Sequence, residues 1–261
     1  VYLKMQILSG EDLIKPVYVP EIAIRELRSL FSTHLLLKKQ RSQIKNRIHS
    51  LLKQNLFPFT KEYIFGKKKF REILSLDMSD NLSCQVRLLF DSLNFLEKQI
   101  QDLELRIIVS SKPFSKQVQI LTSMKGISLI TAIALIADIA TIERFDSAKK
   151  LSSYLRSAPG VDSSNTIIRN LPTNKQGRKL SVTLICQSLN HFRDSNPKLN
   201  DWYHRLEQYK HKGKIRMGLA RKVICEIYYM LKREELHYFC DTTNHKKKIN
   251  EYNRLISKLS A

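Results

Sequence analysis

This sequence is poor in the residues that interrupt helices, with only 7 glycines and 7 prolines among 261 residues. Because both residues destabilise the interior of a helix, their scarcity points to long helices. The chain also lacks any run of about 18 consecutive apolar residues, so we expect no transmembrane helix and no membrane partner. We recognise no signal peptide and therefore expect a cytoplasmic protein.

Cysteines are few and scattered, and no two of them form a C-x-x-C pair: Cys84, Cys186, Cys225 and Cys240. This spacing indicates reduced thiols in a cytosolic protein rather than a disulfide framework. Two of the cysteines lie near His237 and His245, but the spacing fits no standard zinc module. We therefore expect no metal site in this chain.

Acidic residues are also in deficit, because 24 Asp and Glu stand against 45 Lys and Arg and give a formal net charge of +21. A chain this basic favours a polyanionic partner, with nucleic acid first and an anionic membrane second. A basic surface that is merely solvated is the alternative on charge alone. Hydrophobic residues make up 43% of the chain, which is enough for a sizeable core.

Two long helices are predicted in the first half of the chain. The first begins at Pro20-Glu21 and ends near Asn55, and its apolar seam is interrupted by His34 and Arg41. The second has a regular seam in alternating steps of three and four: Val86, Leu89, Leu93, Leu96, Ile100, Leu103 and Ile107. We expect the helices to pair as an antiparallel coiled-coil hairpin or to dimerise; two ordinary bundle helices are the alternative.

The predicted fold is all-α, because short helices are expected through most of the remaining chain. We divide the chain into a short αβ remnant of an upstream domain (1–19), the coiled-coil hairpin (20–110), a small helical domain (111–240) and a basic tail (241–261). The boundary after residue 110 depends on Pro113, which should break the second long helix. The tail carries Lys246, Lys247 and Lys248 and is expected to be frayed or a lone helix.

Residues 121–137 have the pattern of a helix-hairpin-helix, in which two short helices flank a tight turn at Gly126-Ile127-Ser128. Gly126 permits the turn, and the backbone N–H groups that open the second helix suit a phosphate oxygen. Ser128 stands where a second glycine is usual, and its hydroxyl can donate a hydrogen bond to a phosphate. The alternative is a simple corner between two core helices.

A basic turn at residues 173–179 is a second candidate for phosphate contact. Lys175, Arg178 and Lys179 flank Gly177 directly before a predicted helix. Positive charge beside a helix N-terminus is unfavourable, so this placement is easier to explain if a phosphate lies between these side chains. A solvated basic loop explains the charge equally well.

Ser164 lies in a serine-rich stretch, residues 159–165, that we predict to be a loop. A serine in such a loop is usually a turn or cap residue. No histidine or aspartate stands at a spacing diagnostic of a Ser-His-Asp triad. The residues alone therefore do not make Ser164 a nucleophile.

Several motifs together resemble a known family. The order and spacing of four motifs are similar to those of one C-terminal domain. The motifs are residues 124–132, residues 144–148, Pro159 five residues before Ser164, and Thr173-x-Lys175-x-Gly177. That domain belongs to the DEDD-type, serine-bearing bacterial insertion-sequence transposases related to Piv-type DNA invertases, the bridge-RNA-guided recombinases. The likeness covers about residues 119–238, and residues 17–52 resemble the stretch that follows the family's RuvC-like domain.

The resemblance implies a DNA transposase or site-specific recombinase. In the family, a RuvC-like domain with four acidic metal ligands precedes a coiled coil and a helical domain, whose serine is proposed to attack a DNA phosphodiester. Ser164 falls on that position. The implied partners are DNA, a structured guide RNA and further copies of the chain bound through the coiled coil. A divalent metal such as magnesium is expected only with the acidic domain.

The sequence also departs from the family pattern. Asn165-Thr166 replace a glycine pair, and Ser181 replaces an arginine. Since the acidic ligands would precede Val1, we expect a truncated and decayed copy that binds nucleic acid but does not cut it. One alternative is a non-catalytic, dimeric nucleic-acid-binding coiled-coil protein. Another is a structural coiled-coil adaptor whose charge is incidental.

Overall fold

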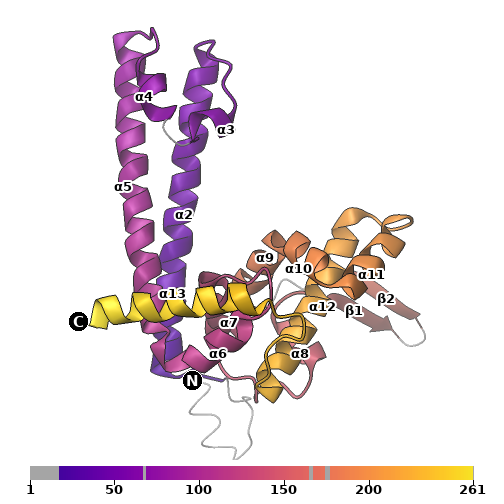
Figure 1. The fold of residues 1–261 in the computed structure, drawn as a ribbon. Coiled ribbons are helices and arrows are strands. Elements are labelled where there is room, and N and C mark those ends of the chain that lie inside the picture. The colour runs from indigo at the N-terminus through magenta and orange to yellow at the C-terminus, as the bar shows by residue number, and fades with distance from the viewer. Residues whose placement is uncertain (1–17, 67–68, 165–166, 174–176, 261) are drawn as a thin grey trace, which may run out of the picture.

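The computed structural model describes residues 18–66, 69–164, 167–173 and 177–260, with backbone alone at 69–71, 161–164, 167–173 and 258–260 (Figure 1). The fold is almost entirely α-helical, as predicted, and consists of a long helical hairpin joined to a helical body. No helix in these ranges combines the length and hydrophobicity needed to span a bilayer. The predicted αβ remnant at 1–19 lies outside the described residues except for Tyr18 and Val19, which have no regular secondary structure.

The predicted long hairpin is confirmed. Helices α2 (Ile22–Gln54) and α5 (Asp80–Ser110) lie side by side, and α3 (Lys61–Ile64) and α4 (Lys69–Leu74) occupy the connection between them. Every seventh residue of the predicted α5 seam is buried: Val86, Leu93, Ile100 and Ile107. His34, which interrupts the α2 seam, is also buried, and its Nε2 lies 2.8 Å from Oε1 of Glu104 on α5.

The hairpin contributes to two separate hydrophobic cores. The distal core lies where α3 and α4 pack on the far end of the hairpin, and includes Ile48, Leu52, Ile64, Ile73 and Val86. At the near end, Ile24, Leu27, Phe31, Ile107 and Ile108 belong to the core of the helical body. The core therefore continues across residue 110, and the domain limits predicted from the sequence stay a prediction.

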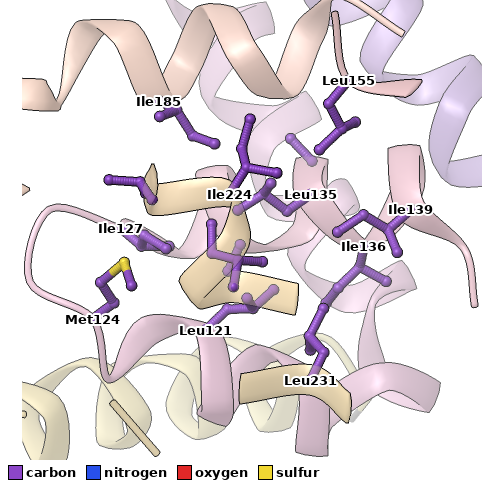
Figure 2. Packing of buried hydrophobic residues seen from close by; sticks show 14 of the residues in the cluster. Leu121, Met124, Ile127, Leu135, Ile136, Ile139, Leu155, Ile185, Ile224 and Leu231 are labelled. Atoms are coloured by element: carbon purple, nitrogen blue, oxygen red, sulfur yellow. The ribbon is translucent and has the colours of Figure 1, made fainter. Parts of the chain in front are cut away.

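The helical body is built around α7 (Leu129–Ile139), in which every residue except Ile130 is buried. Apolar side chains from both sides of the α6–α7 corner meet side chains of α12 in this core (Figure 2). The elements around α7 are η1 (Lys112–Phe114), α6 (Ser115–Thr122), α8 (Ala148–Tyr154), α9 (Leu180–Gln187), α10 (Leu189–Ser195), α11 (Pro197–Glu207) and α12 (Lys212–Arg233).

A β-hairpin corrects the loop that was predicted at residues 159–165. Strands β1 (Pro159–Ser164) and β2 (Ile167–Thr173) pair antiparallel, with Ser164 opposite Ile167 and Pro159 opposite Thr173. The hairpin extends from the body on the side away from α13 (Figure 1). The prediction weighed only the turn-forming serines of the first strand. It overlooked the β-branched Ile167 and Ile168, which favour a partner strand.

The basic tail is also different from the expected frayed or lone helix. Residues Thr242–Ser260 form α13, which packs on α5 and α6. The Tyr252 side chain is fully buried, and its hydroxyl lies 3.1 Å from Ser111 Oγ and donates to Ser111 O at 3.2 Å. Burial of this aromatic ring fixes the segment against the body.

Candidate nucleic-acid interface

At the predicted helix-hairpin-helix, α6 and α7 meet at a corner, an arrangement that the alternative of a corner between two core helices also predicts. Ser128 is the N-cap of α7: its Oγ accepts a hydrogen bond from Thr131 N at 3.2 Å, and the residue is solvent-exposed. Gly126 has φ +101°, and a Cβ at this position would lie 3.1 Å from atoms of His191 and Phe192 in α10. The glycine is therefore required both by its backbone conformation and by the packing of α10 against the turn.

Two other segments hold this corner in place. The Lys248 ammonium of α13 donates to Thr122 O at 3.3 Å and to Ile127 O at 2.8 Å, and burial lowers the pKa of this lysine. The backbone N–H of His237 donates to Ser123 Oγ at 2.8 Å. A cation beside the carbonyl groups that end a helix is favourable, so Lys248 stabilises the end of α6. These hydrogen bonds fix the corner in position. The phosphate contact predicted at Gly126 and Ser128 stays a prediction.

The basic turn lies against the end of α8. Lys175 lies outside the described residues. Gly177 has φ +96°, and a Cβ there would lie 2.3 Å from Tyr154 O, so no other residue fits without a backbone shift. The backbone N–H of Arg178 donates to the same carbonyl oxygen at 3.1 Å, and Lys179 is exposed. Tyr154 thus fixes the position of the turn directly before α9.

Asp138, which the sequence analysis overlooked, is the partner of this turn. Its side chain is buried, and Oδ1 accepts a hydrogen bond from Arg178 Nε at 2.8 Å. Its Oδ2 accepts from Ser181 N at 3.0 Å and from Ser181 Oγ at 2.7 Å. The carboxylate therefore caps the start of α9 and supplies the negative charge that the sequence argument had assigned to a phosphate. A sequence signal existed, since Asp138 is the one charged residue in the apolar helix α7.

Two further arginines lie close to this turn and were not among the predicted contacts. Arg28 of α2 donates from Nε to Ala137 O at 2.7 Å and from Nη2 to Asp138 O at 3.2 Å. Arg144 lies in the loop between α7 and α8, with its Cζ 4.3 Å from the centre of the Tyr154 ring. The seven-residue helix α8 and the turn before α9 thus face arginines from two other parts of the chain.

Ser164 is the last residue of β1, and its side chain lies outside the described part of the structure. The turn at Gly177 follows the other end of the β-hairpin, where Pro159 pairs with Thr173. Because a strand advances about 3.4 Å per residue, the hairpin separates Ser164 from its own base by roughly 17 Å. The structure therefore does not bring Ser164 and Arg178 together.

The apolar stripe of the basic helix α12 packs in the hydrophobic core, as the sequence predicted. Five residues of the stripe are buried: Ile215, Leu219, Val223, Ile227 and Leu231. The basic side chains beside it make local contacts as well. Arg216 Nη2 donates to Cys186 O at 2.9 Å, and Lys222 Nζ lies 4.9 Å from the Trp202 ring.

Comparison with known proteins identifies the domain that contains these residues. Residues 118–204 match the family described as "Transposase IS116/IS110/IS902 family". The matched stretch contains the α6–α7 corner, the β-hairpin with Ser164 and the turn at Gly177. No curated protein matches the chain. Residues 118–204 are therefore a transposase domain of the IS116/IS110/IS902 family, in agreement with the resemblance stated from the sequence, and the family implies DNA binding and transposition.

Proposed function

We propose that this chain acts in DNA transposition, with Ser164 as a nucleophile that attacks a DNA phosphodiester. The observation that carries the proposal is the family match over residues 118–204, which spans Ser164 and the motifs around it. The position of Ser164 at the end of a strand in an extended hairpin is compatible with access to a DNA strand. The folded body behind it would hold the DNA.

The proposed chemistry is a transfer of one phosphodiester bond. The serine oxygen forms a bond to phosphorus as the bond to one strand oxygen breaks, and that oxygen leaves with a proton as a free hydroxyl. The energy of the broken bond is kept in the serine–DNA link, so a later attack by another strand hydroxyl can rejoin DNA. This sequence of steps is the general logic of covalent catalysis and suits recombination without an external energy source.

A divalent metal such as magnesium enters the proposal only as a cofactor of an acidic, RuvC-like domain. In the described part of this chain, no three His, Cys, Asp or Glu side chains converge on a position that would hold a metal ion. The side chains present here therefore do not fit such an ion by themselves, and we assign no step to it.

DNA contacts are proposed at two places on the body. At the α6–α7 corner, Gly126 permits the tight turn and Ser128 presents an exposed residue. At the turn before α9, Lys175, Arg178 and Lys179 surround Gly177 and supply positive charge. Contacts of both kinds bind the DNA backbone without reading its sequence, so they would position the strand for Ser164. A structured guide RNA stays a second proposed partner.

A homo-oligomer through the long hairpin is also proposed. Large apolar side chains are exposed on both of its helices: Leu35, Leu36, Leu88 and Phe95. Leu88 and Phe95 stand seven residues apart and therefore share one face of α5. Exposed apolar residues on a shared face of a long helix favour contact with another helix.

A covalent-adduct assay tests the nucleophile. Because we expect this chain alone to bind DNA without cutting it, the full chain is supplied in trans with an acidic RuvC-like domain of the same family. The mixture is incubated with radiolabelled duplex DNA and magnesium, and adducts are separated on a denaturing gel. We expect adducts from the unmodified chain and from Ser163→Ala, the matched control in the same strand, but none from Ser164→Ala. Adducts that persist in Ser164→Ala remove this residue from the role. DNA binding with no adduct in any variant instead supports the alternative, a non-catalytic nucleic-acid-binding coiled-coil protein.

A further inference from the structure

Two arginines from distant parts of the sequence meet at the C-terminal end of α7. Arg28 of α2 donates to the carbonyl oxygens of Ala137 and Asp138 at 2.7 and 3.2 Å. Arg178, before α9, donates to the side chain of Asp138 at 2.8 Å. Both guanidinium groups are therefore held by the same short segment of α7, one through its backbone and the other through its carboxylate.

Arg144 and Arg178 both contact Tyr154. The Tyr154 carbonyl oxygen accepts a hydrogen bond from Arg178 N at 3.1 Å, and the Tyr154 ring centre lies 4.3 Å from Arg144 Cζ. The rings of Tyr18 and Phe145 lie 4.5 Å from the same carbon. Three aromatic rings thus orient the Arg144 guanidinium by cation–π contact, which neither neutralises the charge nor uses its N–H donors.

Asp138 cannot balance the charge of these three arginines. Each arginine carries one positive charge and Asp138 carries one negative charge, so three minus one leaves +2. Both carboxylate oxygens of Asp138 are already occupied, since Oδ1 accepts from Arg178 while Oδ2 accepts twice from Ser181. Burial, and after it repulsion by Arg178, lower the pKa of Arg28. Gathering these like charges costs free energy that a bound anion would offset.

The acidic residues next to Arg144 in the sequence have other partners. Glu143 Oε2 accepts a hydrogen bond from Thr141 Oγ1 at 3.3 Å. Asp146 forms an ion pair with Lys150 one turn away, and this contact lowers the pKa of Asp146. Among the residues that the structure describes, no carboxylate forms an ion pair with Arg144.

We propose that Arg28, Arg144 and Arg178, the arginine cluster, bind a phosphate group of the DNA backbone. The proposal rests on the proposed DNA-binding function and adds Arg28 and Arg144, which the sequence did not indicate as contacts, to the predicted contact at Arg178. Arg178 is 38% exposed and uses only Nε in its contact with Asp138, which leaves its terminal amino groups for a ligand. Arg144 offers a planar fork of donors already held in position by rings, and Arg28 adds charge.

A DNA titration at several salt concentrations tests the arginine cluster. Binding of a fluorescent duplex of random sequence is followed by anisotropy for the full chain and for Arg144→Gln, Arg144→Lys and Lys149→Gln. Lys149 is the matched control, because it is an exposed cation five residues from Arg144. We expect Arg144→Gln to weaken binding about tenfold and to lower the salt slope by about 0.9, the value for one phosphate contact.

The conservative variant separates geometry from charge. Arg144→Lys should keep the salt slope but weaken binding severalfold, because lysine lacks the planar fork. Lys149→Gln should change affinity by less than about twofold. Equal losses in Arg144→Gln and Lys149→Gln overturn the proposal. If circular dichroism shows that Arg144→Gln is unfolded, Arg144→Lys decides, and wild-type affinity in that variant also overturns it.

Failure of the arginine cluster can be distinguished from failure of the proposed function. If the unmodified chain binds the duplex but Arg144 variants behave like wild type, only the cluster is wrong, and the adduct assay on Ser164 is unaffected. If the unmodified chain binds no duplex at all, the proposed DNA-binding function fails and the cluster with it.

Discussion

At the scale of single residues, Asp138 links α7, on which it lies, to the turn and start of α9 and to α2. Its carboxylate caps the start of α9 and pairs with Arg178, while its carbonyl oxygen accepts from Arg28. A buried carboxylate is tolerated only when its oxygens have partners, and the partners of this carboxylate, Arg178 and Ser181, lie about 40 positions later in the sequence. The local geometry of the turn at Gly177 therefore depends on one side chain of α7.

Replacement of Asp138 tests this dependence. Asp138→Ala leaves the N–H and hydroxyl of Ser181 and the guanidinium of Arg178 without their acceptor. We expect a loss of about 3 kcal/mol in the free energy of unfolding, at the lower end for a buried pair because Arg178 is partly exposed. Urea denaturation followed by circular dichroism measures it. Asp146→Ala, an exposed carboxylate, is the control and should leave the stability unchanged; equal stability of both variants would contradict the role of Asp138.

At the scale of secondary-structure elements, the long helices could be predicted because the periodic spacing of their apolar residues is visible in the sequence. The heptad seam of α5 appears as buried Val86, Leu93 and Ile100, because a helix repeats its contacts along its own sequence. The strand β1 and the docked helix α13 were missed. Tyr252 finds its partner Ser111 across 141 residues, and β1 is a strand only because β2 pairs with it. Such partners are set by tertiary packing, which local propensity does not contain.

The contact between α2 and α5 at His34 and Glu104 predicts a pH dependence. The hydrogen bond with His34 lowers the pKa of Glu104 below its usual value of about 4.3. A carboxyl group whose pKa is depressed by folding stabilises the protein above its unfolded pKa, and this contribution is lost as the pH falls through the folded pKa. We expect the free energy of unfolding to fall by about 0.5 kcal/mol through this group below about pH 4. The value is small because Glu104 is partly exposed and solvent screens the contact.

Urea titrations near neutral pH and at about pH 3 measure this contribution. Glu104→Gln should show a smaller loss of stability on acidification than the unmodified chain. Glu97→Gln removes a carboxylate from the same helix without touching His34, and it should retain the full loss. An identical response in Glu104→Gln and Glu97→Gln would refute the coupling between α2 and α5 at this site.

At the scale of the whole molecule, a strongly basic chain combines a transposase domain with a long hairpin that shares its core. The hairpin and its amphipathic pattern were predictable from sequence, as were the α6–α7 corner and the motifs of the domain. The candidate site was predicted only in part, because Gly177 and Arg178 are visible as a motif whereas Arg28 and Arg144 are brought beside them by the fold. Residues separated by more than 100 positions show no common spacing in a sequence.

The assembly state can be tested on the exposed face of α5. If the chain self-associates through the hairpin, the double variant Leu88→Lys, Phe95→Lys should lower the mass measured by size-exclusion chromatography with light scattering to that of a monomer. The cause would be desolvation of charge at the contact between helices. Tyr209→Lys, an exposed aromatic on the body, is the control and should not change the mass. An oligomer that survives the double variant excludes this face of α5 as the contact.

The shared core at the base of the hairpin has a mechanical consequence. Helix α2 is 33 residues long, which corresponds to roughly 50 Å, and Arg28 stands in its first two turns. Arg28 therefore lies near the base of the helical hairpin, and the other end of α2 reaches the distal core. A tilt of α2 imposed at the distal core would move Arg28 relative to α7. Binding at the far end of the helical hairpin would therefore change the electrostatic potential beside α7.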